Sequence, residues 1–151
     1  MDSLFKIWET SRNNYLRFIE PFTLEQLNKI PEGFNNNIIW NVGHIIAAQQ
    51  SLVYRLSGQP MHISDDFFEL YKPGTKPERA VTQAEVDEMK ALLISLCDQT
   101  KKDIENKIFT SFTERMTVTG FHLGTLADAL EFNNYHEGLH LGMMMSIRKF
   151  L

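Results

Sequence analysis

A threonine followed three residues later by Gln, Glu or Asp occurs at three points of this 151-residue chain where an amphipathic stretch begins. These threonines are Thr23, Thr82 and Thr125. In such a capping box the threonine side chain accepts a hydrogen bond from a backbone N–H of the first helical turn, and the later side chain returns one. Each motif predicts a helix start, and strand signals are nearly missing, so the chain is predicted to be all-α.

Apolar residues recur at helical spacing in four long segments. The segments run from about Ser3 to Ile19, from Asn35–Asn37 to about Leu56, from Thr82 to about Lys107, and from Thr125 through Ile147. A connection rich in proline and glycine, residues 58–81, joins the second and third segments and includes one predicted helical turn around 65–71. Residues 108–124 are predicted to be mostly loop. These features predict one domain, residues 1–151, folded as a four-helix bundle with a long crossover between helices two and three.

Charge and cysteine content exclude several classes of protein. The formal net charge is −4 and no cluster of Lys or Arg forms a stripe, so a nucleic-acid-binding surface is missing. No apolar run approaches the roughly 20 residues that cross a bilayer, and the first residues are typical of an amphipathic helix, not of a secretion signal. Cys97 is the only cysteine, so no internal disulfide can form. A cytoplasmic protein with a small-molecule substrate is expected.

The last helix carries polar residues on the face that should turn inward. That face is predicted to contain Leu126, Ala129, Leu130, Asn133, His136, His140, Met143 and Ile147. A core does not accept consecutive polar positions without a reason. His136 and His140 stand four residues apart, which places both imidazoles on one side of the helix, within reach of a single ion.

His44 repeats this pattern on the second helix, between the apolar residues Trp40 and Ala48. Three imidazoles would leave a coordination position for water or substrate, and zinc or nickel would suit them. Trp40 and Asn133, each one turn before a histidine, are predicted to line the pocket or to orient the ligands. The alternatives are a non-catalytic module that binds a metal or small ligand, and a polar core without metal.

Two further motifs on the last helix each have more than one interpretation. The string from His136 to His140 matches the HExxH signature of zinc metalloproteases, in which Glu137 would be the general base. No His, Asp or Glu follows His140 to supply the usual third ligand, so a hydrolase is the weaker alternative and Glu137 is expected to be solvated or to support a ligand. Gly138 and Gly142 interrupt the same helix, which suggests a dimer contact, room for substrate or tight packing.

The motif Asn37-Ile-Ile-Trp40-Asn-Val-Gly-His44, followed by His136-xxx-His140 and Gly142, resembles the DinB superfamily of DinB/YfiT-like proteins over nearly the whole chain. The resemblance implies a helical bundle, frequently a homodimer, with nickel or zinc on three histidines that match His44, His136 and His140. It also implies a thiol S-transferase that uses a low-molecular-weight thiol such as bacillithiol, or a related enzyme. It does not imply DNA binding. No thiol-cofactor motif is recognisable, so the substrate stays open.

Overall fold

Helices make up most of the computed structural model, which describes residues 2–151. The α-helices in that range are α1 (Asp2–Ile19), α2 (Leu24–Asn28), α3 (Ile38–Gln50), α4 (Asp65–Tyr71), α5 (Gln83–Glu105) and α6 (Leu126–Ile147). Helix α3 continues into a π-helical turn, η1 (Ser51–Arg55), and α6 ends in a 3₁₀ turn, η2 (Arg148–Phe150). A hairpin of two short antiparallel strands, β1 (Arg115–Met116) and β2 (His122–Leu123), precedes α6. The predicted all-α class is confirmed.

The predicted helix starts are present. Thr23, Thr82 and Thr125 are the N-caps of α2, α5 and α6, and in each case the side chain three residues later completes the capping box. The helical turn predicted around residues 65–71 is α4, and the Ser64 hydroxyl caps it by accepting a hydrogen bond from the backbone N–H of Phe67. Local signals therefore set where these helices begin.

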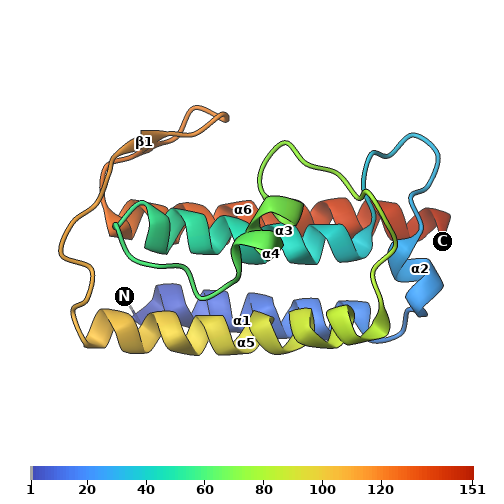
Figure 1. Cartoon of the computed structure of the whole chain (residues 1–151), viewed down its shortest axis with the longest axis horizontal. Coiled ribbons are helices and arrows are strands. Elements are labelled where there is room, and N and C mark those ends of the chain that lie inside the picture. Colours follow the sequence, from blue (N-terminus) through green and yellow to red (C-terminus); the bar gives the residue numbers. More distant parts are fainter. Residues whose placement is uncertain (1) are drawn as a thin grey trace.

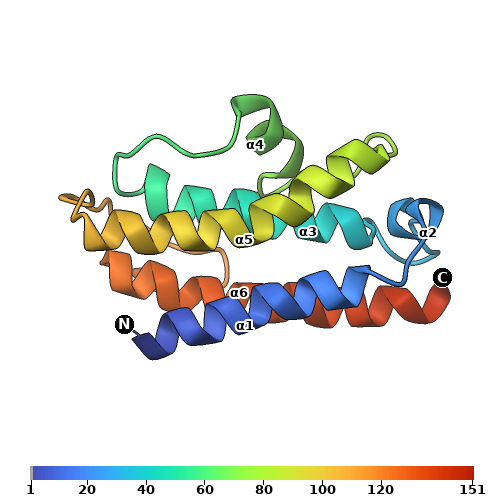
Figure 2. The same ribbon diagram turned by 90° about the horizontal axis from the view of Figure 1, so that it is seen from below.

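The long helices α1, α3, α5 and α6 lie side by side along the long dimension of the molecule (Figure 1). Helix α6 packs against both α1 and α3, and α5 packs against the same two helices. A view turned by 90° separates α1 and α6 from α3 and α5 (Figure 2). Helices α1 and α6 run in one direction, and α3 and α5 in the other. The crossover, residues 56–82, contains α4 and returns the chain to the end where α5 begins.

Helix α3 is buried along its whole length of 13 residues. It contacts α2, α4, α5 and α6, so no side of it faces open solvent. A polar side chain on α3, such as that of His44, is therefore held inside the molecule. Within residues 2–151, no helix is both long and apolar enough to span a bilayer.

The buried side of α6 differs from the sequence prediction. Met144 is fully buried, whereas Met143, which was predicted to face inward, is 42% exposed. Glu137 is fully buried, and His136 and His140 are partly exposed. The reason is that α6 packs against α1 as well as α3, so its buried stripe is displaced from the predicted one toward the residues that contact α1.

Candidate metal centre

Three histidines meet between α3 and α6. His44 lies on α3, His136 and His140 lie on α6, and one ring nitrogen of each lies within 4.8 Å of the others. Nε2 of His136 and Nε2 of His140 are 3.2 Å apart. The ring centroid of His44 lies 5.2 Å from that of His136 and 4.6 Å from that of His140. The structure thus brings together the three residues predicted as metal ligands.

The sequence of α3 explains how His44 is held. Gly43 allows the ring of Tyr71 to lie against the helix, because a Cβ at Gly43 would come within 2.7 Å of that ring. The carbonyl oxygen of Tyr71 then accepts a hydrogen bond from Nδ1 of His44 at 2.7 Å. A carbonyl oxygen can only accept, so Nδ1 carries the proton and Nε2 keeps the lone pair that can bind a metal.

Asn41 fixes His140 in the same way. The side-chain oxygen of Asn41 lies 2.8 Å from Nδ1 of His140. The amide of Asn41 is oriented by its nitrogen, which donates to the side-chain oxygen of Asn36 and to the carbonyl oxygen of Asn37. Nδ1 of His140 is therefore the donor, and Nε2 again keeps the lone pair. A second hydrogen bond that fixes the ring and tautomer is typical of metal-binding histidines.

His136 is the imidazole that the protein satisfies least. Its Nδ1 is buried without a hydrogen-bond partner, and its Nε2 faces the lone pair on Nε2 of His140. Either His136 donates a proton there, or a cation binds both lone pairs. A cation at this point would bind the two facing Nε2 lone pairs, and imidazole nitrogens suit zinc or nickel.

Burial keeps these imidazoles uncharged. Removal from water, with a smaller contribution from the neighbouring histidines, lowers the pKa of His136 to about 4 and that of His140 to about 3. Burial also lowers the pKa of His44. Because only the neutral imidazole offers a lone pair, a cation would not have to displace protons from this site near neutral pH.

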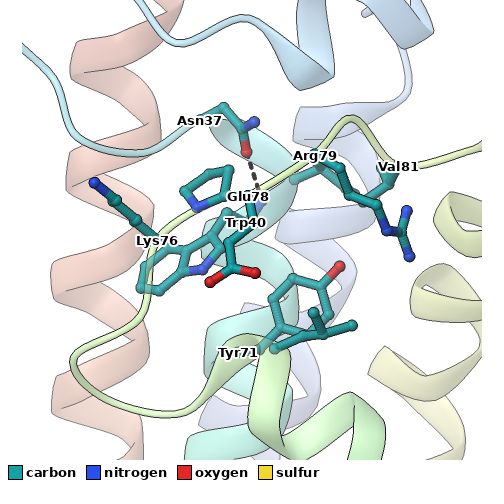
Figure 3. A pocket seen from close by; sticks show the side chains of 10 residues that line it. Asn37, Trp40, Tyr71, Lys76, Glu78, Arg79 and Val81 are labelled. Carbon is teal, nitrogen blue, oxygen red and sulfur yellow. Dashed lines mark hydrogen bonds between the residues drawn. The ribbon is translucent and has the colours of Figure 1, made fainter.

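Trp40 contacts His44 and also lines a small recess, which Figure 3 shows. Its indole ring stacks on the His44 ring, with centroids 4.8 Å apart and planes 12° apart. The recess has a volume of about 20 Å³, enough for about one water molecule. Its walls include Tyr71 and residues 76–79 of the crossover. The indole Nε1 is buried without a hydrogen-bond partner, so Trp40 brings an unused donor next to the histidines.

Comparison with known families agrees with this geometry. The model of a family described as the DinB superfamily matches residues 7–144. This chain belongs to the DinB superfamily. The match includes all three histidines and extends from α1 into α6. No curated protein matches the chain. The resemblance indicated by the two histidine motifs is thereby confirmed.

Glu137 and Asn133 of this DinB protein lie in a different network from the histidines. Glu137 is fully buried, so the expectation of a solvated side chain is wrong. Its carboxylate accepts hydrogen bonds from Trp8 and Arg12 of α1. The side-chain nitrogen of Asn133 also donates to it, at 2.8 Å, and not to a histidine. A carboxylate already engaged by these donors is a poor general base, which removes the main support for the HExxH hydrolase alternative.

Sequence reasoning missed three groups that support the DinB site. Arg12 is fully buried and pairs with Glu137. The sequence did indicate burial of Arg12, because this residue lies one turn after Trp8 on the inward side of α1. Asn41 stands three residues before His44 and thus on the same side of α3, which was also a readable hint. The Tyr71 carbonyl had no signal, since any residue carries a carbonyl group.

His62 and His122 do not join the three clustered histidines. His62 lies 3.2 Å from a carboxylate oxygen of Asp103, and His122 lies 3.1 Å from one of Glu114. Both side chains are substantially exposed, as expected for histidines in connections. Cys97 is buried, and burial raises its thiol pKa to about 12. A thiol with so high a pKa is a poor nucleophile near pH 7.

Proposed function

We propose that this protein is a metal-dependent enzyme in which His44, His136 and His140 hold one divalent ion, zinc or nickel. The observation that carries the proposal is the approach of three imidazole nitrogens to within 4.8 Å of one another. The hydrogen bonds to the Nδ1 atoms of His44 and His140 support it, because they direct both Nε2 lone pairs to the shared centre. The group in residues 2–151 that could hold an ion includes no carboxylate, so protein ligands would leave a position for substrate.

A bound ion of this kind would lower the pKa of a thiol or water and so supply a nucleophile near neutral pH. The residues of the chain have separate tasks in this scheme. Tyr71 and Asn41 keep the imidazoles in one tautomer and orientation. Trp40 shields His44 on one ring face and offers its Nε1–H to an acceptor atom of the substrate. We propose that the four long helices act as a four-helix bundle that keeps these groups in register.

The first test is the metal content of untagged protein purified without chelator. We expect close to one zinc or nickel ion per chain, and loss of that ion in His44→Ala and in His136→Ala. His62→Ala is the matched control, because His62 lies outside the cluster, and it should keep the ion. If wild-type protein holds no metal and takes none up on addition, the metalloenzyme proposal is wrong.

The second test concerns the reaction class. Within the DinB superfamily we propose transfer of a low-molecular-weight thiol to an electrophile in the cytoplasm, where thiols stay reduced. Metal-loaded protein, bacillithiol and monochlorobimane should give turnover that His140→Ala abolishes. An absence of turnover with every thiol tried would refute the transferase while leaving the metal site standing.

We also propose that two copies pair through the outward side of α6. Tyr135, Leu139 and Met143 lie there one turn apart and are between 42% and 49% exposed. Gly138 and Gly142 have open space where a Cβ would be, so packing inside the chain does not explain two glycines that each cost about 1 kcal/mol in a helix. Sedimentation should show a dimer that Leu139→Lys separates. A monomeric wild type at micromolar concentration would contradict this.

A further inference from the structure

Several side chains of helix α1 bind one residue of α6, Glu137. Trp8 Nε1 donates to Oε1 of Glu137 at 2.9 Å, and Arg12 donates through Nη2 at 2.8 Å and through Nε to both carboxylate oxygens at 3.1 and 3.0 Å. The hydroxyl of Tyr15 donates to the main-chain carbonyl of Glu137. The side chains of Arg12 and Glu137 are fully buried, as are Trp8 and Tyr15. Three residues on one side of α1 thus converge on one residue of α6.

We propose that Glu137 is a positioning residue that sets the rotation of α6 about its axis and thereby directs His136 and His140 toward His44. The proposal rests on the proposed metal site. Because a helix is rigid over one turn, fixing the direction of Glu137 toward α1 fixes the directions of its neighbours in the helix. A rotation of about 10° would move a side-chain tip 5–6 Å from the axis by about 1 Å, whereas metal–ligand distances tolerate about 0.2 Å.

An apolar contact at this position would not fix the rotation of α6. Burial of apolar surface stabilises a packed helix without prescribing its rotation. Hydrogen bonds from the planar guanidinium are directional, and several of them at one carboxylate permit only a narrow range of orientations. A buried ion pair often adds less stability than apolar residues of the same volume. Directional contact, and not maximal stability, is therefore what Arg12 and Glu137 contribute.

The test compares Co²⁺ binding in three proteins. Wild type is set beside the double variant Arg12→Met/Glu137→Met, which replaces the ion pair by apolar side chains of similar length and leaves no buried charge unpaired. Tyr54→Phe is the matched control, because it keeps the buried ring and removes only a hydroxyl whose hydrogen bonds go to Thr100 and Asp103 of α5, not to Glu137. The visible absorption of Co²⁺ reports the geometry of its ligands, and competition with a chelator gives its affinity.

We expect the double variant to keep its helical circular dichroism, to change the Co²⁺ absorption spectrum and to bind Co²⁺ about 10- to 100-fold more weakly, the range typical of groups that orient metal ligands. Tyr54→Phe should retain the wild-type spectrum and affinity. A double variant with wild-type spectrum and affinity overturns the proposal. Wild-type protein that binds no Co²⁺ refutes the metal site itself, a separate result.

A single substitution covers the case in which the double variant does not fold. Trp8→Phe removes one donor to Glu137 and leaves the ion pair intact. We expect the Co²⁺ absorption spectrum to shift in the same direction as in the double variant, and the Co²⁺ affinity to fall a few fold. Stability will fall for any truncation of a buried ring, so only the spectrum and affinity count. If both are unchanged in a folded Trp8→Phe protein, the positioning role is refuted.

Discussion

The α1 side and the α3 side of α6 carry polar residues that are adjacent in sequence but differ in how fully they are bonded. On the α1 side, the carboxylate of Glu137 accepts hydrogen bonds from three side chains and is fully buried. On the α3 side, His136 leaves Nδ1 unpaired, and its Nε2 faces a second imidazole. The carboxylate on the α1 side is fully engaged without any ligand, although Oδ1 of Asn133 beside it has no partner. The α3 side has lone pairs that only a cation or a rearranged proton can satisfy, and this difference marks which side is available for chemistry.

Breaking the ion pair on the α1 side should have the largest effect on stability. Arg12→Met leaves the Glu137 charge buried without its partner, so the free energy of unfolding should fall by about 3–5 kcal/mol. Urea denaturation followed by circular dichroism measures it. Arg17→Met removes an exposed cation from the same helix and should change stability by no more than about 0.5 kcal/mol. A loss of less than about 1 kcal/mol in Arg12→Met would mean that Glu137 is not bound as described.

Two buried asparagines provide the sharpest test of the two sides. Asn41 bonds to His140, whereas Asn133 bonds to Glu137. Asn41→Ala should weaken zinc binding about 10- to 100-fold. Asn133→Ala should cost about 1 kcal/mol of stability with little change in zinc affinity, because Asn133 lies on α6 itself and its hydrogen bond to Glu137 does not link α6 to α1. Isothermal titration and urea denaturation of both variants check this. If instead Asn133→Ala weakened zinc binding and Asn41→Ala did not, Asn133 would belong to the metal site, as its spacing from His136 predicts.

Gly43→Ala tests the α3 side through a contact in which α6 takes no part, that between Gly43 and the ring of Tyr71. The added Cβ would meet the ring of Tyr71, so we expect a loss of about 1–3 kcal/mol of stability from overpacking. The double variant Gly43→Ala/Tyr71→Leu removes the ring and should be more stable than the sum of the single effects predicts. Thermal or urea unfolding of the four proteins completes the cycle. Strict additivity would show that Gly43 and Tyr71 do not restrict one another.

Acid should weaken the metal-free protein through the same histidines. The folded-state pKa values, about 4 for His136 and about 3 for His140, lie below the unfolded value near 6.5. The unfolded chain therefore binds more protons, so stability is full above about pH 6.5 and falls as the pH decreases. Each histidine should account for about 1 kcal/mol between pH 6.5 and 5.5. Urea midpoints in the presence of chelator should depend less on pH in His136→Gln than in wild type.

Most helix positions could be predicted because their signals are local. Capping threonines mark the starts of three helices, apolar spacing marks the four long segments, and the short helix α4 was predicted as a turn within the crossover. The three histidines could also be found, because they are polar residues at inward positions. Features that depend on contact between distant segments could not be predicted. Glu137 and His136 are neighbours in sequence, and nothing local states that one turns to α1 and the other to α3.

The partners of the histidines show the same limit. Asn41 reaches His140 across 99 positions of sequence, and the Tyr71 carbonyl reaches His44 across 27. Such pairs depend on how the helices pack, which helical periodicity does not encode. Met143 illustrates the smaller error of one residue in the buried face, since packing against α1 displaces that face to Met144.

The separation of the ligands along the chain has a consequence for when an ion can be taken up. His44 belongs to α3, whereas the other two ligands belong to α6, which is synthesised after α1, α3 and α5. On the ribosome, His44 therefore emerges long before its partners. An ion bound as proposed could be taken up only after release of α6 from the ribosome. Because imidazole ligands discriminate little between zinc and nickel, the metals available to the folded chain would then determine which ion it carries.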